Sequence, residues 1–335
     1  MKIPLSSYGL HRSVEPLGSF PQQAWRLDAT TPCRENEIEI SVERLHLDAS
    51  SCRQLREAHA NSELRIGAAV LALVADRGKM HNPATNSGGI LTGHVTATGA
   101  DVPDPPAIGT KIATLVSLSL TPLRLVRIRS MGLKRCELAV DGTAYLFQSG
   151  AWASMPTDLP ESVLLEAFDV AGAPARVKMR CRPGDRVVVF GAGRSGILSA
   201  VAASECGAVA ILLVDIDAER LARCDGLKIR GVSVLQADAR DAGNIAALLP
   251  DKADLTVSCV DVEGIEPACL VATKPHGHVL FFSMVTSFAR AALSAEGMGS
   301  AATLEIGNGL AADHANDVVS IMRSHPQVQQ LFATV

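Results

Sequence analysis

The sequence predicts an α/β protein of two domains, and three observations lead to this prediction. The chain has 335 residues, too many for one ordinary hydrophobic core and suited to two domains of about 150 residues each. Its first half alternates short strand-like runs with turns rich in proline and glycine, which favours a small β-barrel or sandwich. Its second half alternates nearly continuous apolar runs with helix-length segments, which is typical of a doubly wound parallel sheet.

The composition favours a small-molecule partner. Hydrophobic residues make up 47% of the chain and charged residues 20%, the balance of a folded globular protein. A net charge of -4 provides no basic surface for nucleic acid or for a membrane. No apolar run reaches the length of about 18 residues that spans a bilayer, and the N-terminus lacks the apolar core of a signal peptide. We therefore expect a cytoplasmic protein.

The first domain is predicted to span residues 1–160. One long helical segment, residues 50–78, interrupts its strands. The proline-containing stretch at 156–160 marks the expected boundary, so the second domain is predicted over residues 161–335. The strand-like runs of the first domain lie at 37–48, 90–99, 110–120 and 143–156.

The eight cysteines do not form a ligand or disulfide pattern in the sequence. No two of them are closer than ten residues, whereas a structural zinc lobe or a disulfide framework needs closely spaced pairs. Cys52, Cys136, Cys206 and Cys259 lie among apolar or small residues. We expect isolated, mostly buried thiols that contribute to packing.

A glycine-rich turn follows the first strand of the second domain. Gly191, Gly193 and Gly196 form a G-x-G-x-x-G pattern between a strand and a helix. In a dinucleotide site the first glycine permits the turn, the second lets the backbone approach the pyrophosphate, and the third lets helix and strand pack closely. The N-terminus of the helix, with Arg194 and Ser195, then stabilises the phosphate charge. The pattern alone is weak evidence, because glycine turns at strand ends are common.

The next strand strengthens the interpretation. It ends in Asp215, 24 residues after Gly191, where a carboxylate can accept hydrogen bonds from both ribose hydroxyls of the adenosine. A carboxylate there repels a 2'-phosphate, so NAD is favoured over NADP, although Arg194 and Arg220 leave this preference open. Ser283 and Thr286 follow a later strand at its C-terminal end and are predicted to contact the nicotinamide.

The order of the two domains resembles the medium-chain dehydrogenase/reductase superfamily. Longer runs are similar to one zinc-free family within it, the L-erythro-3,5-diaminohexanoate dehydrogenases. The resemblance implies an N-terminal GroES-like β-barrel domain, a C-terminal Rossmann domain that binds NAD, and a homodimer formed through the strand TLEIGNG. It also implies oxidative deamination of a diamino acid to 5-amino-3-oxohexanoate, ammonia and NADH, a step of lysine fermentation. The runs that carry it lie at 77–89, 111–123, 169–175, 281–297 and 306–315.

The zinc-binding pattern of the wider superfamily is absent. Gly88-Gly89-Ile90 stands where Gly-His-Glu would be expected, and His94 follows inside a predicted strand. The other expected ligand positions fall near Asp48 and near Asp169 or Val170. Isolated carboxylates without imidazole or thiolate make a poor tetrahedral zinc site. We expect no catalytic metal, and an ordinary strand position for His94.

Amine oxidation can proceed without a metal if carboxylates are present. Asp169 is the first candidate for the general base, because the run DVAGAPA is predicted to open the helix that passes the vacated metal position. Asp48 is the second, because it faces the same position if the superfamily geometry holds. Each can also be read as a helix cap or a loop acid. Glu296, or Asp313 with His314, could bind the distal 5-ammonium group, unless they are solvated loop charges.

The substrate carboxylate needs a cation or several hydrogen-bond donors. Lys79 or Arg77 could supply the cation, or both could be surface charges beside a turn. Ser117, Ser119 and Thr121 alternate along what reads as an extended run, so one face would present three hydroxyl groups. A half-exposed strand without a ligand has the same pattern.

Two other functions remain open at this point. A zinc-free quinone or enone reductase would have the same domains without carboxylates for ammonium groups. A non-catalytic regulatory protein would bind NAD alone. In the enzymatic interpretations we expect the substrate in the cleft between the two domains.

Overall fold

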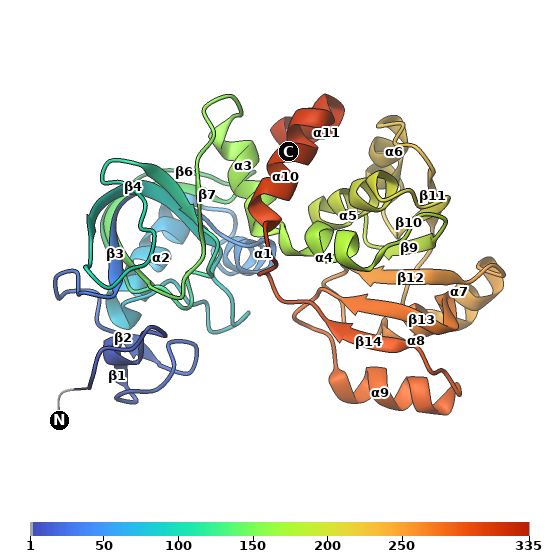
Figure 1. Ribbon diagram of the computed structural model, residues 1–335, viewed down its shortest axis with the longest axis horizontal. Helices are drawn as coiled ribbons and strands as arrows, with labels where there is room; N and C mark the ends of the chain where they lie inside the picture. The colour runs from blue at the N-terminus through green and yellow to red at the C-terminus, as the bar shows by residue number, and fades with distance from the viewer. Residues whose placement is uncertain (1–2, 335) are drawn as a thin grey trace. The chain divides into compact units, whose positions relative to one another are not determined.

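The computed structural model describes residues 3–334 and separates into two units. The first unit ends at Asp169 and the second is Val170–Thr334; Figure 1 labels their elements. The boundary expected at residue 160 therefore differs from this division by one helix, α3 (Glu161–Asp169). This helix belongs with the first unit because Glu161 accepts hydrogen bonds from Thr92 (2.7 Å) and Lys111 (2.8 Å).

An antiparallel sheet of six strands, in the order β6-β7-β3-β4-β5-β8, forms the first unit. Ile38, Ile40 and Val42 are buried along β3 and belong to one apolar core, as period-two alternation requires. A separate two-stranded pair, β1 with β2, precedes the sheet. The strands are β1 Ser13–Glu15, β2 Arg26–Leu27, β3 Glu37–His46, β4 Ile90–Thr98, β5 Lys111–Thr114, β6 Leu123–Gly132, β7 Glu137–Phe147 and β8 Trp152–Ser154.

The single long helix predicted for this unit is wrong. Two helices form instead, α1 (Ala49–Ala58) and α2 (Glu63–Arg77). A short 3-10 helix at Leu10–Arg12 lies earlier, before β1. The break has a backbone cause, because Ala60 and Asn61 adopt positive φ angles of 50° and 55° that a helix cannot contain.

A disulfide links Cys52 and Cys136, which corrects the expectation of isolated thiols. The two residues are 84 positions apart in the sequence, so no spacing pattern revealed the pair. The fold brings them together because Leu47 donates a backbone hydrogen bond to Cys136 (2.9 Å) and α1 begins directly afterwards. Their Cα atoms are 5.9 Å apart, an ordinary separation for a disulfide. Cys206 and Cys259 are free.

The second unit contains the predicted doubly wound parallel sheet. Its strand order is β11-β10-β9-β12-β13-β14, and every pairing is parallel. The order reverses between β9 and β12, the position at which open α/β sheets bind ligands. The strands are β9 Arg186–Phe190, β10 Ala210–Asp215, β11 Val232–Gln236, β12 Ala253–Ser258, β13 Thr273–Phe281 and β14 Thr303–Ile306.

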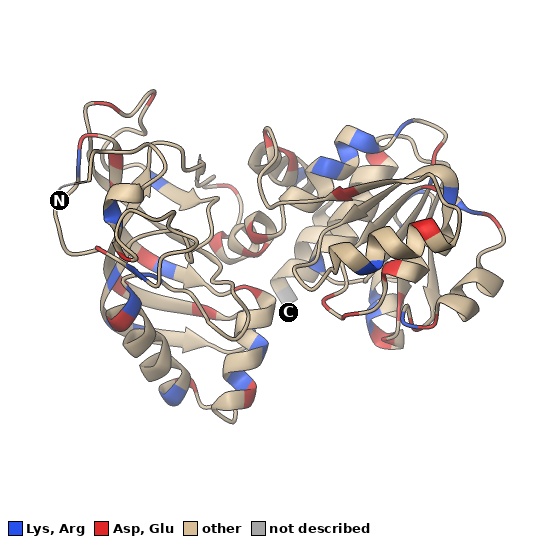
Figure 2. Ribbon diagram, turned by 90° about the horizontal axis from the view of Figure 1, so that it is seen from below, with Lys and Arg blue, Asp and Glu red and all other residues tan. Residues whose placement is uncertain are grey.

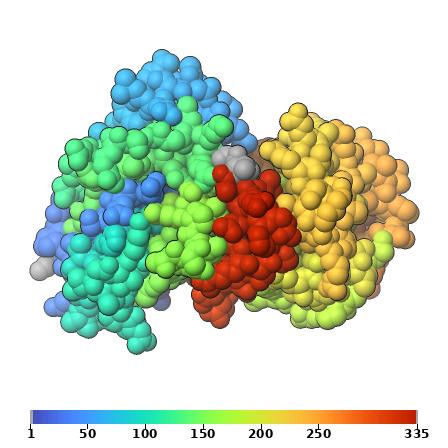
Figure 3. All heavy atoms as spheres, turned by 90° about the horizontal axis from the view of Figure 1, so that it is seen from above, coloured from blue at the N-terminus to red at the C-terminus, as the bar shows by residue number. Residues whose placement is uncertain are grey.

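The helices of the second unit form two packed groups. Helices α4, α5 and α10 contact one another, and α8 contacts both α7 and α9. Figure 1 shows these groups along the parallel sheet, and Figure 3 shows α10 and α11 as one continuous red block. The helices are α4 Gly172–Arg180, α5 Arg194–Glu205, α6 Ala218–Gly226, α7 Ala242–Leu248, α8 Glu266–Ala272, α9 Phe288–Gly297, α10 His314–Ser324 and α11 Pro326–Thr334.

Charges of both signs are distributed over each unit, as Figure 2 shows. Among residues 3–334, no helix has the length and apolar character needed to cross a membrane.

A buried ion pair connects the N-terminal segment to the first sheet. The Arg12 and Glu37 side chains are fully buried, and Arg12 donates to both oxygens of Glu37 (2.7 and 2.5 Å). Burial by itself raises the pKa of Glu37, but hydrogen bonds from Arg12 and His11 outweigh it and lower the pKa to about 2.

We expect Arg12→Ala to lower the free energy of unfolding by about 3–5 kcal/mol, because Glu37 would remain buried without its cation. The pKa of Glu37 in the folded protein lies below the ordinary value of 4.5, so its stabilisation is present above that pH. It is lost as the pH falls from 4.5 towards 2. Urea denaturation from pH 7 to pH 2 measures both effects. Arg240→Ala, which breaks an exposed pair with Asp238, is the control, and equal losses in the two variants would contradict the prediction.

Candidate active site

The glycine-rich turn after β9 has the geometry of a phosphate-binding loop. Gly191 has a φ of 98°, a conformation that favours glycine. A Cβ atom at Gly196 would lie 1.7 Å from the carbonyl oxygen of Gly191, so only glycine lets α5 approach the strand this closely. A Cβ atom at Gly193 would meet no atom within 4 Å. Gly193 therefore borders open space at the N-terminus of α5, and this cradle fits a dinucleotide pyrophosphate.

Asp215 ends β10 beside this turn. Its carboxylate accepts hydrogen bonds from the backbone N–H of Ala192 (2.7 Å) and of Asp217 (2.9 Å), and from Arg220 (3.2 Å). The Arg220 side chain is 44% exposed and also lies 3.7 Å from Asp217. The carboxylate is thus held at the position expected for a ribose contact, with a guanidinium next to it.

The other predicted cofactor residues also lie at the carboxyl edge of the parallel sheet. Arg194 and Ser195 begin α5, directly after Gly193. Ser283 and Thr286 lie in the loop after β13, where the Thr286 N–H donates to the Ser283 carbonyl (3.2 Å). Both residues are partly exposed.

Asp48 precedes α1 in the first unit and caps its N-terminus. One carboxylate oxygen, Oδ1, accepts hydrogen bonds from the Ser51 N–H (2.8 Å), the Ser50 hydroxyl (2.8 Å) and the Ser87 hydroxyl (3.0 Å). The other oxygen, Oδ2, is buried and has no hydrogen-bond partner among residues 3–334. A buried carboxylate oxygen without a donor is costly, so Asp48 is suited to receive a donor from a bound molecule.

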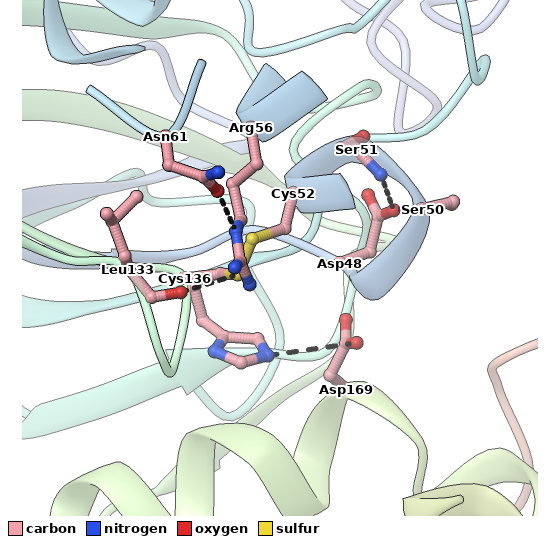
Figure 4. Close-up of a disulfide and its surroundings, with 10 residues drawn as sticks. Asp48, Ser50, Ser51, Cys52, Arg56, Asn61, Leu133, Cys136 and Asp169 are labelled. Carbon is pink, nitrogen blue, oxygen red and sulfur yellow. Dashed lines mark hydrogen bonds and ion pairs between the residues drawn. A yellow bond between two sulfur atoms is a disulfide. The ribbon is translucent and has the colours of Figure 1, made fainter. Parts of the chain in front are cut away.

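Asp169, the first candidate for the base, ends α3 rather than opening the following helix. Its Oδ2 lies 3.9 Å from Nε2 of His46, the last residue of β3. The His46 side chain is 3% exposed and that of Asp169 is 17% exposed. A helix dipole disfavours a carboxylate at a C-terminus. In the view of Figure 4, Asp48 and Asp169 both lie to the right of the disulfide.

The Gly88-Gly89 turn packs directly against the segment that carries these residues. A Cβ atom at Gly89 would lie 1.9 Å from the carbonyl oxygen of His46 and 2.9 Å from the backbone nitrogen of Asp48, and Gly89 has a φ of 104°. A Cβ atom at Gly88 would lie 2.3 Å from the Met80 carbonyl oxygen. Neither position has room for the side chain of a metal ligand.

The donors in this segment do not fit the tetrahedral zinc of the wider superfamily. No group of three His, Cys, Asp or Glu side chains within residues 3–334 has the arrangement of a metal site. Asp48 Oδ1 is already occupied by three donors, and Cys52 is in a disulfide. His94 lies in β4, as predicted, with its side chain 44% exposed and Nδ1 3.2 Å from Glu43.

Lys79 and Arg77 point into the protein rather than to its surface. Lys79 is fully buried and donates to the Pro21 carbonyl (2.6 Å); burial and the neighbouring Arg77 lower its pKa to about 8. Arg77 donates to the Trp25 and His81 carbonyls and stacks on the Trp25 ring at 3.9 Å. Both side chains thus contact residues of the N-terminal segment, Pro21 and Trp25. This geometry does not support their predicted role in binding the substrate carboxylate.

The hydroxyl groups of Ser117, Ser119 and Thr121 do not lie along one face of a strand. The strand β5 ends at Thr114, and a turn follows it. The turn itself brings Ser117 and Ser119 within 2.8 Å, while the buried Thr121 donates to the Ser117 carbonyl (3.2 Å). A Cβ atom at Gly88 would lie 2.9 Å from the Ser119 backbone nitrogen, so this turn packs against the Gly88-Gly89 segment.

The residues considered for the distal ammonium group lie in the second unit. Glu296 is exposed on α9. Asp313 precedes α10 with a positive φ of 54°, and His314 is buried with Nδ1 2.6 Å from the Ala311 carbonyl oxygen. Asp48 and Asp169 belong to the first unit, so the role of these three residues with the distal ammonium group stays a prediction.

Sequence reasoning missed His46, Ser51 and Ser87. A histidine two positions before the candidate base was visible in the motif LHLDASS, but its pairing with Asp169 depends on the fold. Ser87 was visible only as part of the turn before Gly88.

Comparison with known proteins identifies relatives over the whole chain. Residues 11–156 match the family model of the L-erythro-3,5-diaminohexanoate dehydrogenase N-terminal domain. The chain is 37% identical to L-erythro-3,5-diaminohexanoate dehydrogenase of Acetoanaerobium sticklandii over 97% of both chains. It is 36% identical to the enzyme of the same name from Fusobacterium nucleatum, again over 97% of both chains.

Solved structures confirm the fold at lower identity. Alcohol dehydrogenase TADH from Thermus sp. ATN1 superposes with a TM-score of 0.56 at 18% identity, covering 92% of this chain and 87% of that one. CurK enoyl reductase gives a TM-score of 0.56 at 14% identity, over 99% and 85% of the two chains. These structures share the two-domain fold, with an antiparallel sheet in the first unit and a parallel sheet in the second. On the full-length similarity, the chain belongs to the L-erythro-3,5-diaminohexanoate dehydrogenase family.

Proposed function

We propose that the protein oxidises L-erythro-3,5-diaminohexanoate with NAD and releases 5-amino-3-oxohexanoate, ammonia and NADH. The observation that carries the proposal is the identity of 36–37% to two enzymes of that name across nearly the whole chain. An enone reductase has the same fold but no need for buried carboxylates, and Asp48 with a free buried oxygen favours the deaminase.

The reaction sets two requirements for the residues of the site. The 3-ammonium group must lose a proton before its carbon can release a hydride, and the iminium product carries a positive charge. NAD, held by the glycine-rich turn after β9, would supply the acceptor for this hydride. Water then adds to the iminium, and ammonia leaves. A proton acceptor and a negative charge near the reacting nitrogen satisfy both requirements.

Asp48 is the proposed acceptor of the ammonium proton. Its Oδ2 is buried and has no hydrogen-bond donor within the described chain, whereas its Oδ1 receives three hydrogen bonds that hold the carboxylate in place. The N-terminus of α1 adds a favourable dipole. The sequence favoured Asp169 over Asp48 as the base. We now place Asp48 first, because its Oδ2 has no donor among the described residues whereas Oδ2 of Asp169 lies beside His46.

Asp169 and His46 are proposed to act together on the water that attacks the iminium. The two side chains lie 3.9 Å apart, and the His46 side chain is 3% exposed and that of Asp169 17% exposed. Histidine and carboxylate side chains are the usual groups that move a proton to or from a reacting water. Asp169 also supplies negative charge for the cationic intermediate.

NAD is the proposed cofactor, and Asp215 is the residue that distinguishes it from NADP. Its carboxylate is fixed by two backbone N–H groups and would repel a 2'-phosphate. The nearby Arg220 is already paired with both Asp215 and Asp217, which reduces its availability for a phosphate. A homodimer formed through β14, the edge strand of the parallel sheet, stays a prediction that sedimentation of the native protein tests.

The substrate assay is the first test. With L-erythro-3,5-diaminohexanoate and NAD we expect the purified protein to form NADH, with lower efficiency when NADP replaces NAD. Absorbance at the NADH band follows the reaction. Failure with this substrate, together with NADPH consumption on enones, would identify a reductase instead. Tight NAD binding without either activity would favour a regulatory protein.

Substitution of each carboxylate by asparagine tests the catalytic roles of Asp48 and Asp169. We expect Asp48→Asn and Asp169→Asn each to lower kcat at least about tenfold, because each removes a positioned proton acceptor. NAD affinity, measured by fluorescence quenching, should not change. Asp101→Asn, an exposed acid of the same unit, is the control. Wild-type turnover in either active-site variant would remove that residue from the mechanism.

Two glycine variants test the cofactor loop. Gly193→Ala fills open space at the N-terminus of α5, so we expect an unchanged melting temperature and NAD binding weakened about tenfold or more, equivalent to about 1.4 kcal/mol. Gly196→Ala forces a contact with Gly191 and should destabilise the fold by about 1–3 kcal/mol. Calorimetric titration with NAD and thermal melting distinguish the two. Unaltered NAD affinity in Gly193→Ala would place the pyrophosphate elsewhere.

A further inference from the structure

A group of three hydroxyl side chains supports Asp48 from outside its own helix. Ser87 donates to Asp48 Oδ1 at 3.0 Å, and its oxygen lies 2.7 Å from that of Thr85 and 2.9 Å from that of Ser51. Ser51 and Thr85 are themselves 2.9 Å apart. The three oxygens therefore form a closed triangle, and one corner of it contacts the carboxylate.

The triangle joins two distant segments of the chain. Ser51 lies in α1, whereas Thr85 and Ser87 belong to a turn in which Asn82 and Ser87 pair through their backbones. The Asn82 N–H donates to the Ser87 carbonyl (2.9 Å), and the Asn82 side chain accepts from Ala84 (3.0 Å). The turn is thus held by its own hydrogen bonds, and it delivers the Ser87 hydroxyl in a defined position.

The position of Ser87 also depends on the residues that follow it. Gly88 and Gly89 run against the Met80 carbonyl and the His46 carbonyl, where a side chain would not fit. This close approach brings Ser87 beside Asp48, in the segment where the wider superfamily has its metal-ligand motif.

Oδ1 of Asp48 is saturated by three donors, and Oδ2 has none. A carboxylate held at one oxygen cannot rotate freely, so its second oxygen keeps a fixed direction. Hydrogen bonds to the charged form also favour ionisation. Ser50 and the Ser51 N–H come from the helix that Asp48 itself caps, so Ser87 is the donor that fixes the carboxylate relative to the rest of the sheet.

We propose that Ser87, supported by Thr85 and Ser51, is a positioning residue that directs Oδ2 of Asp48 towards the substrate ammonium group. The inference rests on the proposed function, in which Asp48 accepts the ammonium proton.

The test compares Ser87→Ala with Ser87→Thr, which keeps the hydroxyl. In Ser87→Ala we expect kcat to fall about tenfold with little change in KM. The acidic limb of the kcat/KM profile should move to higher pH by about one pH unit, because the ionised Asp48 loses a donor. Ser87→Thr should restore both values. Ser149→Ala removes a comparable hydrogen bond, to the Ser7 carbonyl (2.7 Å), and is the control for a serine lost elsewhere in the unit.

The pH profile must be assigned to Asp48, because other groups near this segment titrate. His46 at the end of β3 and Asp169 at the end of α3 are these groups, and the disulfide removes Cys52 from consideration. The profile is therefore repeated in Asp169→Asn, where the shift caused by Ser87→Ala should persist. Loss of the shift in that background would assign it to the His46 and Asp169 pair and overturn the proposal.

Asp48→Asn is measured in parallel to separate the role of Asp48 as proton acceptor from the role of Ser87 in positioning it. An inactive Asp48→Asn together with a Ser87→Ala variant that matches wild type in kcat and in its acidic limb would overturn the role of Ser87 alone. Wild-type turnover in Asp48→Asn would overturn the proposed base and this inference with it. Thermal melting of each variant checks that the fold is kept, and a Ser87→Ala variant that only melts earlier, with kcat and pH profile unchanged, contradicts the proposal.

Discussion

Gly89 lies so close to the His46 carbonyl that a side chain cannot occupy its position. A Cβ atom would fall 1.9 Å from that oxygen, and the φ of 104° is itself one that favours glycine. The contact holds the Gly88-Gly89 turn against the segment from His46 to Asp48. Leu118 then donates to the Gly89 carbonyl (2.8 Å), which joins the turn containing Ser117 and Ser119 to the same place. The arrangement of the carboxylates follows from this packing.

The packing has an electrostatic consequence. It places a hydroxyl on one oxygen of Asp48 and leaves the other without a donor. In an amine dehydrogenase the substrate binds as an ammonium cation and hydride transfer produces a cationic iminium, so a fixed carboxylate stabilises charges that a zinc ion would repel. The same turn that lacks a metal ligand therefore supplies an arrangement suited to an ammonium substrate.

Much of the second unit could be predicted from the sequence, because buried parallel strands read as continuous apolar runs and the glycine turn has a fixed pattern. The first unit was harder. The break between α1 and α2 depends on two residues with positive φ that have no strong sequence signal. The pairing of Cys52 with Cys136 and of His46 with Asp169 depends on contacts across the fold. Lys79 is buried because a backbone carbonyl of the N-terminal segment accepts a hydrogen bond from its ammonium group.

A crystal structure of the Asp169→Asn variant with NAD and L-erythro-3,5-diaminohexanoate tests the central claim most directly. We expect the nitrogen of the 3-amino group within about 3 Å of Asp48 Oδ2, with Ser87 still donating to Oδ1. A nitrogen bound by other residues, or a metal ion between the substrate and Asp48, would contradict it.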